Sequence, residues 1–301
     1  MKVRFAHRAE YAALRAAVAV VSLLPWRAAS AFGAAIGRLG YWPLRIRRRV
    51  VDRQLAAALP ELDDAARRRT ARDSYASIGM VAIQTAVASR MTPAAILDLF
   101  HPPAGWEHVE GPVREGRGVL LVSGHVGNWE LGGAYVAARG IPIDGVVRKM
   151  SNPLVDGYLT RSRRRLGWEA VYDGDAVRRV PRSIASGRVV ALLADQGVQG
   201  LSAIFVPFFG RLARTPRGPA LLALRLKAPC VFAAVLREPD GKYRIYFDPV
   251  PVVDTGDREK DIDAIVAAYT RQLEMHVRRV PGQYFWQHRR WRRRPDGTME
   301  D

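Results

Sequence analysis

Three short apolar runs, each bounded by glycine, proline or polar residues, do most to limit the folds open to this chain. They lie at residues 119–122, 189–193 and 231–235. Runs of this length are typical of strands buried on both faces. Helical periodicity separates them at residues 129–139, 153–166, 177–186 and 216–226, and residues 243–247 alternate like an edge strand. This alternation predicts an α/β fold with a mixed, largely parallel sheet flanked by helices.

Composition removes several classes of protein. The chain has 301 residues, of which 49% are hydrophobic, so it can bury a core and does not have the composition of a disordered chain. It has no apolar run of about 18 residues, which a polytopic membrane protein would need. Cys230 is the only cysteine, which excludes an intrachain disulfide and a multi-cysteine zinc site. The net charge of +18 predicts an acidic partner: nucleic acid, an anionic membrane or an acidic protein.

The first 44 residues contain two apolar runs, at 16–24 and 28–37, separated by Pro25. Each run is too short to span a bilayer, which takes about 20 residues, and proline breaks the helix between them. One interpretation is a cleaved signal peptide with its cleavage site at Ala29-Ser30-Ala31. A second is a buried helical hairpin. We favour a helix lying in the membrane interface, with aromatic side chains at headgroup depth: Trp26, Tyr41 and Trp42.

Basic and proline-rich stretches suggest how the chain is divided. The arginine-rich run at residues 45–49 is placed to meet anionic headgroups, although such runs are often solvated helix faces. Pro93 and the pair Pro102-Pro103 lie before residue 110, near which the pattern changes from helical periodicity to alternating apolar strands and amphipathic helices. We therefore predict a helical membrane-anchoring and support region at 1–110, and an α/β catalytic domain with a basic tail at 111–301.

Polar and titratable side chains follow two of the apolar runs. Residues 123–130 read Ser-Gly-His-Val-Gly-Asn-Trp-Glu, and Ala194-Asp195-Gln196 follows residue 193. Ligands of open α/β sheets bind beyond the carboxyl ends of the strands. Both segments are therefore expected to contribute to one site.

His125 and Glu130 are the first candidates for acid–base chemistry. Asn128 is a good N-cap, so Glu130 should lie in the first turn of a helix, where the helix dipole favours its ionised form. His125 would then lie in the preceding turn and could fold back toward Glu130. An ionised Glu130 holding one ring nitrogen would leave the other free as a general base. The alternative is that His125 stabilises the turn and Glu130 only complements the dipole.

The sequence offers no obvious protein nucleophile. The G-x-S-x-G, HExxH, Walker A and GxGxxG patterns are absent, and Cys230 sits in an apolar strand where a reactive thiolate is disfavoured. A histidine base without a nucleophile suits direct transfer, in which a substrate hydroxyl is deprotonated and attacks an activated acyl group.

The segment 123–130 resembles the H-x4-[D/E] (HX4E) block of the bacterial lipid A biosynthesis lauroyl/myristoyl acyltransferases, within the lysophospholipid acyltransferase superfamily. Other blocks follow in the family's order: residues 145–153 with Arg148 and Asn152-Pro153, Asp195-Gln196, residues 205–210, Thr215, and residues 283–290. The likeness covers roughly residues 10–295.

The resemblance implies an acyltransferase with His125 as general base and Glu130 as its orienting partner. It implies acyl transfer from an acyl-carrier-protein thioester to a hydroxyl of a lipid A precursor, without metal or cofactor. It also implies work at the cytoplasmic face of the inner membrane. The expected partners are acyl carrier protein or acyl-CoA, a phosphorylated glycolipid acceptor and an anionic membrane surface, whereas scattered arginines without a known nucleic-acid motif argue against nucleic acid.

The matched blocks also suggest substrate-binding residues: Arg148, Asn152, Asp195, Gln196, Phe208, Thr215, His288 and Arg289. Arg148 would bind an acceptor phosphate, or else form an ion pair with Asp195. Phe208 would line an acyl channel, or else belong to the core. Thr215 would open a helix and help to hold an anion, or else only cap it.

The residues between His125 and Glu130 depart from the more apolar form of the lipid A enzymes. They look like the wider group that includes actinobacterial phosphatidylinositol-mannoside acyltransferases, which are similar in the same blocks. Those enzymes take an acyl-CoA donor and a mannose hydroxyl. An acyl-CoA-dependent enzyme acting on another glycolipid or a lysophospholipid is therefore the alternative function.

Overall fold

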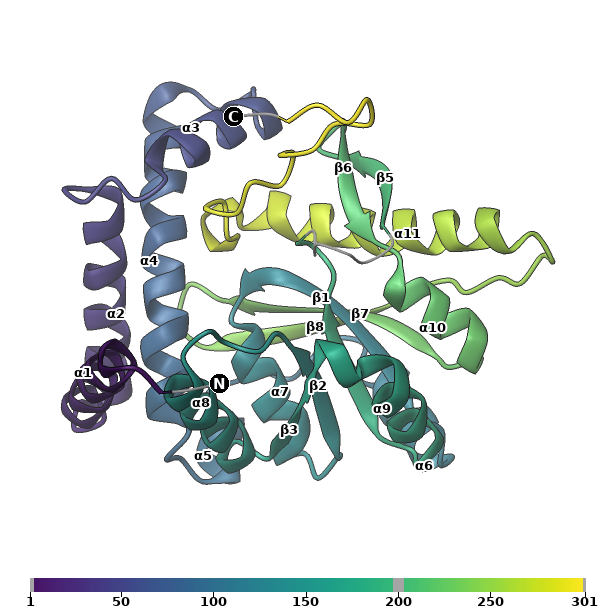
Figure 1. Ribbon diagram of the computed structural model, residues 1–301, viewed down its shortest axis with the longest axis horizontal. Helices are drawn as coiled ribbons and strands as arrows, with labels where there is room; N and C mark the ends of the chain where they lie inside the picture. The colour runs from purple at the N-terminus through teal and green to yellow at the C-terminus, as the bar shows by residue number, and fades with distance from the viewer. Residues whose placement is uncertain (1–2, 197–202, 300–301) are drawn as a thin grey trace.

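A computed structural model describes residues 3–196 and 203–299 (Figure 1). Six helices precede the sheet: α1 (Phe5–Val21), α2 (Trp26–Tyr41), α3 (Arg48–Ala58), α4 (Asp64–Ala88), α5 (Pro93–Leu97) and α6 (Glu107–Arg114). The next elements are β1 (Val119–Gly127), α7 (Trp129–Ala138), β2 (Ile143–Val147), α8 (Pro153–Arg165), β3 (Trp168–Tyr172), α9 (Asp173–Ala185) and β4 (Val189–Leu193). The last are β5 (Ala203–Phe208), β6 (Arg211–Pro216), α10 (Gly218–Leu226), β7 (Cys230–Arg237), β8 (Tyr243–Pro249) and α11 (Arg258–Arg279).

The main sheet has six strands in the order β3-β2-β4-β1-β7-β8. All neighbours are parallel except β7 and β8, which pair antiparallel at one edge. The predicted α/β class, with its largely parallel mixed sheet and its edge strand near residues 243–247, is confirmed. β5 and β6 form a separate antiparallel hairpin that the sequence did not predict.

The two faces of the sheet are buried under different helices, as strands with apolar residues on both faces require. Leu120 and Val122 of β1 belong to the larger apolar cluster, which includes residues of α9, α10 and α11. The alternate residues Val119 and Leu121 belong to a second cluster, with residues of α5, α6 and α7. β1 therefore lies at the centre of the core.

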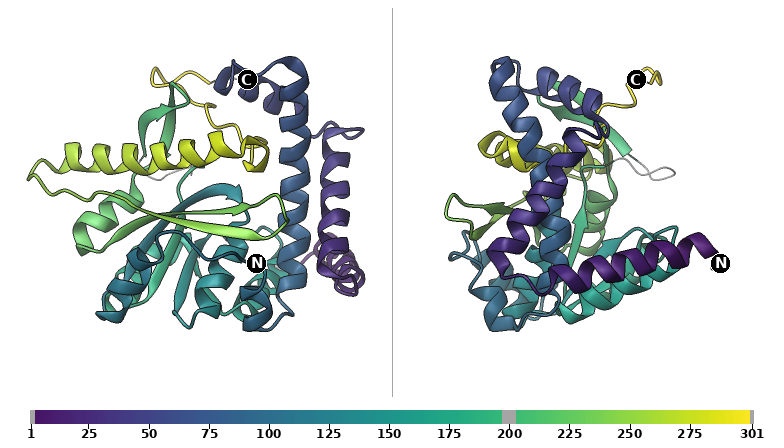
Figure 2. Two further views of the ribbon diagram at one scale, coloured as in Figure 1. Left: turned by 180° about the vertical axis from the view of Figure 1, so that it is seen from behind. Right: turned by 90° about the vertical axis from the view of Figure 1, so that its left-hand side faces the viewer.

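Two helix starts differ from the sequence prediction. α9 begins at Asp173 rather than near 177, and Asp173 and Asp175 lie in its first turn, where the helix dipole favours acidic groups. α10 begins at Gly218, so Thr215 does not open a helix and lies in β6 instead. The long helix α11, which runs alongside the sheet (Figures 1 and 2), was also not predicted.

The N-terminal helices form a layer beside the sheet. α1 ends at Val21 and α2 begins at Trp26, so the break expected at Pro25 is present. α2 lies along α4 (Figures 1 and 2), with Ala29 fully buried. Among residues 3–196 and 203–299, no helix combines the length and hydrophobicity needed to cross a bilayer.

The aromatic residues expected at headgroup depth have different environments. Trp42 is exposed, whereas Trp26 is half-buried against the second apolar cluster. Tyr41 is buried beneath the Arg48 guanidinium, which corrects the prediction that it faces the membrane. α5 and α6 pack with the sheet, and the chain between them pairs with β8 through Phe100. The division of the chain at residue 110 stays a prediction.

Candidate active site

An irregularity at the carboxyl end of β1 presents His125. Pairing between β1 and β7 is regular as far as Ser123 and resumes only at Gly127, so the residues between them leave the ladder. Gly127 has φ +62°, and a Cβ there would lie 1.7 Å from the Val235 carbonyl oxygen. Only glycine fits this position, and the resulting bulge takes residues 124–126 out of the pairing with β7.

The His125 ring is held by Asp195, which lies just beyond the carboxyl end of the neighbouring parallel strand β4. Asp195 Oδ1 is 2.7 Å from His125 Nδ1, and Oδ2 accepts the His125 backbone N–H at 2.9 Å. Gly124 makes this approach possible, because a Cβ there would lie 3.3 Å from Asp195 Cγ and 2.6 Å from a Leu273 methyl carbon. The two strand ends singled out in the sequence therefore meet in one site, as expected for a parallel sheet.

Asp195 is only 2% exposed, and burial alone would oppose its ionisation. The charge of the His125 ring, the two hydrogen bonds from His125 and the nearby Arg290 outweigh burial and lower the pKa of Asp195 to about 2. Asp195 is therefore a carboxylate at any physiological pH. Burial, together with the charge of Asp195, in turn raises the pKa of the adjacent Tyr284 well above its usual value, so this phenol stays protonated.

The rest of the His125 ring is partly open. Its side chain is 18% exposed and packs edge-on against Trp129, with ring centroids 4.7 Å apart, and beside Phe285. Among the described residues, Nε2 has no hydrogen-bond partner. With Nδ1 donating to the carboxylate, Nε2 is the nitrogen that can accept a proton.

The helix after the bulge begins as the sequence predicts. Asn128 caps α7 and accepts the Leu131 backbone N–H, and Glu130 lies in the first turn. Glu130, however, does not hold His125. Its carboxylate forms a two-pronged ion pair with Arg163 of α8, at 2.7 and 3.3 Å. The predicted hydrogen bond between the two is thus replaced by two separate pairs, His125–Asp195 and Glu130–Arg163.

Arg163 belongs to an arginine-rich stretch at the end of α8. It is largely buried, and its guanidinium lies over the Trp168 ring at 5.1 Å. Buried, paired arginines of this kind fix the relative position of the elements that carry them. The Glu130–Arg163 pair therefore joins the first turn of α7 to α8.

The residues after β2 do not converge on His125. Arg148 is exposed and forms no ion pair with Asp195, whose partner is His125. Asn152 is buried and caps α8, while its amide donates to the His7 carbonyl and to Glu10 of α1. Its polar atoms thus attach α1 to α8, and its contact with substrate stays a prediction, as does that of Arg148. Gln196 is half-buried beside Asp195.

Phe208 and Thr215 both lie on the β5–β6 hairpin and are buried. Phe208 packs against Phe209, Tyr284 and Trp291 in the core, which is the alternative to an acyl channel. The prediction that Thr215 opens a helix is therefore wrong. Its hydroxyl instead accepts a hydrogen bond from Arg290 at 2.6 Å, within a buried polar network.

The C-terminal block contributes a residue that sequence reasoning missed. Arg290 is buried, bonds Thr215 and the Arg214 carbonyl, and stabilises the charge of Asp195. Its neighbour Arg289, the predicted residue, is exposed. Burial lowers the pKa of His288 to about 4, so His288 is neutral at physiological pH.

Within residues 3–196 and 203–299, no three histidine, cysteine or acidic side chains come together as a metal site would require. The expectation that no metal or cofactor takes part stays a prediction. The groups that can do chemistry here are a partly open imidazole and the buried carboxylate that holds it. Fold and site together define an α/β protein in which a partly open imidazole, held by a buried carboxylate, lies at the carboxyl end of the central strand.

Comparison with known proteins identifies the family. Residues 2–293 match the family described as bacterial lipid A biosynthesis acyltransferase, and the chain belongs to this family and is an acyltransferase. It is 29% identical over 282 residues to the lipid A biosynthesis lauroyltransferase of Escherichia coli K12, covering 93% of this chain and 90% of that protein. It is 25% identical over 276 residues to the lipid A biosynthesis palmitoleoyltransferase of the same strain, covering 91% and 88%.

A third relative is a phosphatidylinositol mannoside acyltransferase from Mycolicibacterium smegmatis. It is 25% identical over 190 residues, which cover 62% of this chain and 60% of the relative. Both groups suggested by the motif blocks are therefore among the relatives, and acyl transfer to a glycolipid is common to their names.

Proposed function

We propose that this protein transfers a fatty acyl chain from an acyl-carrier-protein thioester to a hydroxyl of a lipid A precursor or related glycolipid. The observation that supports this most directly is the His125 ring, held through Nδ1 by the buried Asp195 with Nε2 left open. The two lipid A relatives match the chain over about nine-tenths of its length, which favours a lipid A precursor as acceptor.

In the proposed reaction, His125 Nε2 removes the proton of the acceptor hydroxyl as its oxygen attacks the thioester carbonyl. A new C–O bond forms and the C–S bond breaks. The proton held on the imidazolium passes to the leaving thiolate, which restores neutral His125. Asp195 stabilises the imidazolium and keeps the ring turned so that Nε2 faces the substrate.

Glu130 has a positioning role in this proposal and does not form the hydrogen bond to His125 that the sequence predicted. Through Arg163 it fixes the first turn of α7 against α8. His125, Asn128 and Trp129 lie in or beside that turn, so the ion pair supports the position of the base without contact with it.

The alternative is an acyl-CoA-dependent enzyme acting on another glycolipid or a lysophospholipid. The name of the mycobacterial relative, a phosphatidylinositol mannoside acyltransferase, supports a glycolipid acceptor other than lipid A. The net charge of +18 suits an acidic carrier protein, a phosphorylated acceptor and an anionic bilayer.

The function is tested by mass spectrometry of membrane glycolipids from cells with and without the enzyme, followed by transfer assays with purified protein. We expect a glycolipid that gains the mass of one fatty acid less one water, and faster transfer from acyl carrier protein than from acyl-CoA. Faster transfer from acyl-CoA to a mannoside would favour the alternative. No acylated product from any donor and acceptor pair would contradict acyl transfer to these lipids.

We also propose that the protein binds the cytoplasmic face of the inner membrane through its N-terminal helices. Exposed apolar side chains gather there: Phe5, Val20, Leu23, Phe32, Ile36, Leu39, Trp42, Leu44 and Ile46. Large exposed apolar patches usually mark an interaction surface, and arginines at residues 45–49 adjoin this one. Together these features favour shallow insertion combined with attraction to anionic headgroups.

Binding to anionic vesicles should depend both on insertion of the exposed apolar side chains and on electrostatic attraction to the headgroups. Leu23→Gln with Leu44→Gln should lower vesicle binding about tenfold or more, because each exposed leucine contributes roughly 1 kcal/mol on insertion. Raising salt from about 0.1 to about 1 M should weaken wild-type binding further, because the screening length falls from about 10 to about 3 Å. Vesicle flotation measures both effects. Val177→Gln with Leu212→Gln, two exposed sites elsewhere, is the control. Equal binding by both double variants would contradict this surface.

A further inference from the structure

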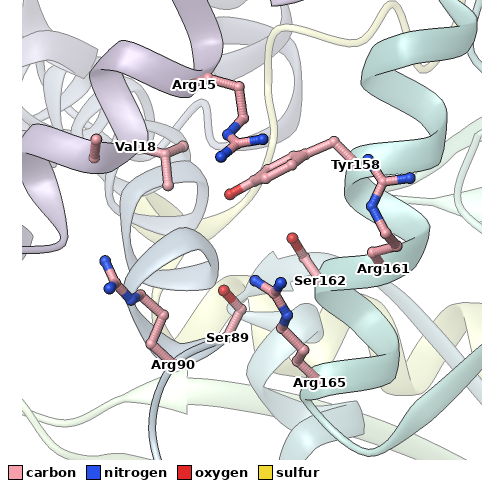
Figure 3. A pocket seen from close by; sticks show the side chains of 9 residues that line it. Arg15, Val18, Ser89, Arg90, Tyr158, Arg161, Ser162 and Arg165 are labelled. Carbon is pink, nitrogen blue, oxygen red and sulfur yellow. The ribbon is translucent and has the colours of Figure 1, made fainter.

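A cavity of about 340 Å³ lies between α1, the end of α4 and α8. Four arginines line it: Arg15 of α1, Arg90 after α4, and Arg161 and Arg165 of α8 (Figure 3). Its volume lies at the lower end of the range typical of small-ligand pockets, about 300 to 1,000 Å³. It is separate from the His125 site, whose residues do not line it.

The charge of this cavity is not balanced by the protein. No acidic residue lines it, and none of the four arginines forms an ion pair with a carboxylate in the part of the chain that the structure describes. Arg15 donates a hydrogen bond to the Tyr11 hydroxyl, and its guanidinium lies over the Tyr158 ring. Gathering like charges in one cavity costs free energy unless an anion occupies it.

Two hydroxyl groups support an oxygen-rich ligand. Ser162 is 3% exposed, and its Oγ is buried and without a hydrogen-bond partner, although it points into the cavity (Figure 3). The Tyr158 hydroxyl is directed inward beside it. A buried hydroxyl left unpaired costs about 1 to 3 kcal/mol, so a ligand that bonds it would recover that cost.

The arginines come from α1, from α8 and from the turn after α4, and this spread favours one anion geometry over another. A carboxylate offers two oxygens in one plane, whereas a phosphate offers three or four in tetrahedral arrangement, and guanidinium forks match either pair of its oxygens. Arg15, Arg90 and Arg165 line the cavity from different sides (Figure 3), which suits a ligand with oxygens in several directions.

The position of the cavity indicates where the phosphate comes from. Val18 of α1 lines it, and α1 carries part of the exposed apolar surface described above. Ser162 also precedes Arg163, which is paired with Glu130 in the first turn of α7. α8 thus links the cavity to the catalytic histidine's surroundings.

We infer that this cavity binds the phosphate group of a membrane lipid, held by Arg15, Arg90 and Arg165 with Ser162. This inference rests on the proposed function in taking the phosphorylated glycolipid acceptor as the first source. A phospholipid of the bilayer carries the same group and is the second source.

The test is vesicle flotation of the full-length chain, which does not require acyl transfer. Vesicles of a phosphate-free galactosyl diacylglycerol contain a phosphorylated lipid A precursor, the same lipid after phosphatase treatment, or phosphatidylglycerol. The variant is Arg90→Gln with Arg165→Gln. Arg178→Gln with Arg179→Gln removes equal charge from the exposed face of α9 and is the control.

We expect the cavity variant to bind the phosphorylated precursor about tenfold more weakly than the control variant, and both to bind the dephosphorylated lipid equally. A deficit with phosphatidylglycerol alone would assign the cavity to a bilayer phospholipid. Equal binding by both variants to every vesicle would overturn the inference. Failure of all forms to transfer acyl groups, with the binding difference intact, would count against the proposed function only.

Ser162→Ala is a second variant, for the case in which the double arginine variant does not fold. Because it removes an unpaired buried hydroxyl, it should leave the melting temperature unchanged or raise it. Weaker binding to the phosphorylated precursor by about threefold or more, at unchanged stability, would support direct contact. Unchanged binding would remove Ser162 from the site.

Discussion

His125→Ala is expected to lower kcat by roughly 10³- to 10⁴-fold, with the acceptor KM within about twofold of wild type. Removing a general base costs rates of this order, while the acceptor's phosphate and acyl chains would still bind elsewhere. The side chain is partly exposed and its loss leaves the sheet intact, so the protein should remain folded.

Single-turnover transfer from a thioester donor, with thermal unfolding recorded on the same samples, measures this effect. His101→Ala is a matched control, because His101 also pairs with an aspartate, Asp240, but on the protein surface. Near-wild-type transfer by His125→Ala would contradict the mechanism. If the variant unfolds, His125→Gln provides the same test with a larger polar side chain.

The sequence predicted the start of α7 and the turn before it, because helix capping depends on residues that are close together in the chain. Asn128 as N-cap, Glu130 in the first turn and His125 in the preceding turn all follow from residues within one turn of helix. The apolar runs likewise predicted β1 and β4, and the strand-end rule placed the segments of His125 and Asp195 at one edge.

The pairing of side chains could not be predicted in this way. Asp195 lies 70 residues from His125, and Arg163 lies 33 residues from Glu130. Proximity in sequence favoured the pair His125–Glu130. Two conditions decided otherwise, and both depend on tertiary structure. β4 is the immediate neighbour of β1, and glycine at 124 allows Asp195 to approach.

Arg289 and Arg290 show the same limit at the C-terminal block. They are adjacent and chemically identical, yet only Arg290 is buried against Thr215. Outside a regular helix or strand there is no periodicity to tell which of two neighbours faces inward. The conformation after α11, fixed by Gln54 bonding the carbonyls of Trp286 and His288, selects Arg290.

Asp195→Asn should lower kcat by about 10³-fold or more, and it distinguishes the two candidate partners of the histidine. An asparagine that accepts from the His125 backbone N–H through its oxygen presents its NH₂ group to Nδ1. This arrangement favours the tautomer that places the proton on Nε2, where it cannot act as a base. The imidazolium formed during transfer also loses its counter-charge, which lowers the rate further.

Glu130→Gln is the matched comparison, since it removes the other carboxylate by the same chemistry. Glu130→Gln leaves Arg163 unpaired, so adding Arg163→Gln to it should recover part of the lost kcat. Adding Arg163→Gln to Asp195→Asn should recover none, because those two residues do not pair. The same kinetic assay on the four variants decides the matter. A kcat loss of about 10³-fold in Glu130→Gln, with a near-wild-type rate in Asp195→Asn, would restore Glu130 as the partner of His125.

Stability provides a second readout for Asp195 with a defined sign. Its pKa is lowered to about 2 in the folded protein, whereas an unfolded aspartate titrates near 3.9. The carboxylate therefore contributes stability that is complete above about pH 4 and is lost as the pH falls toward about 2. Asparagine does not titrate, so Asp195→Asn should lose less stability than wild type across that window. Glu130→Gln should retain the wild-type loss, because it leaves Asp195 and its contacts with His125 and Arg290 intact.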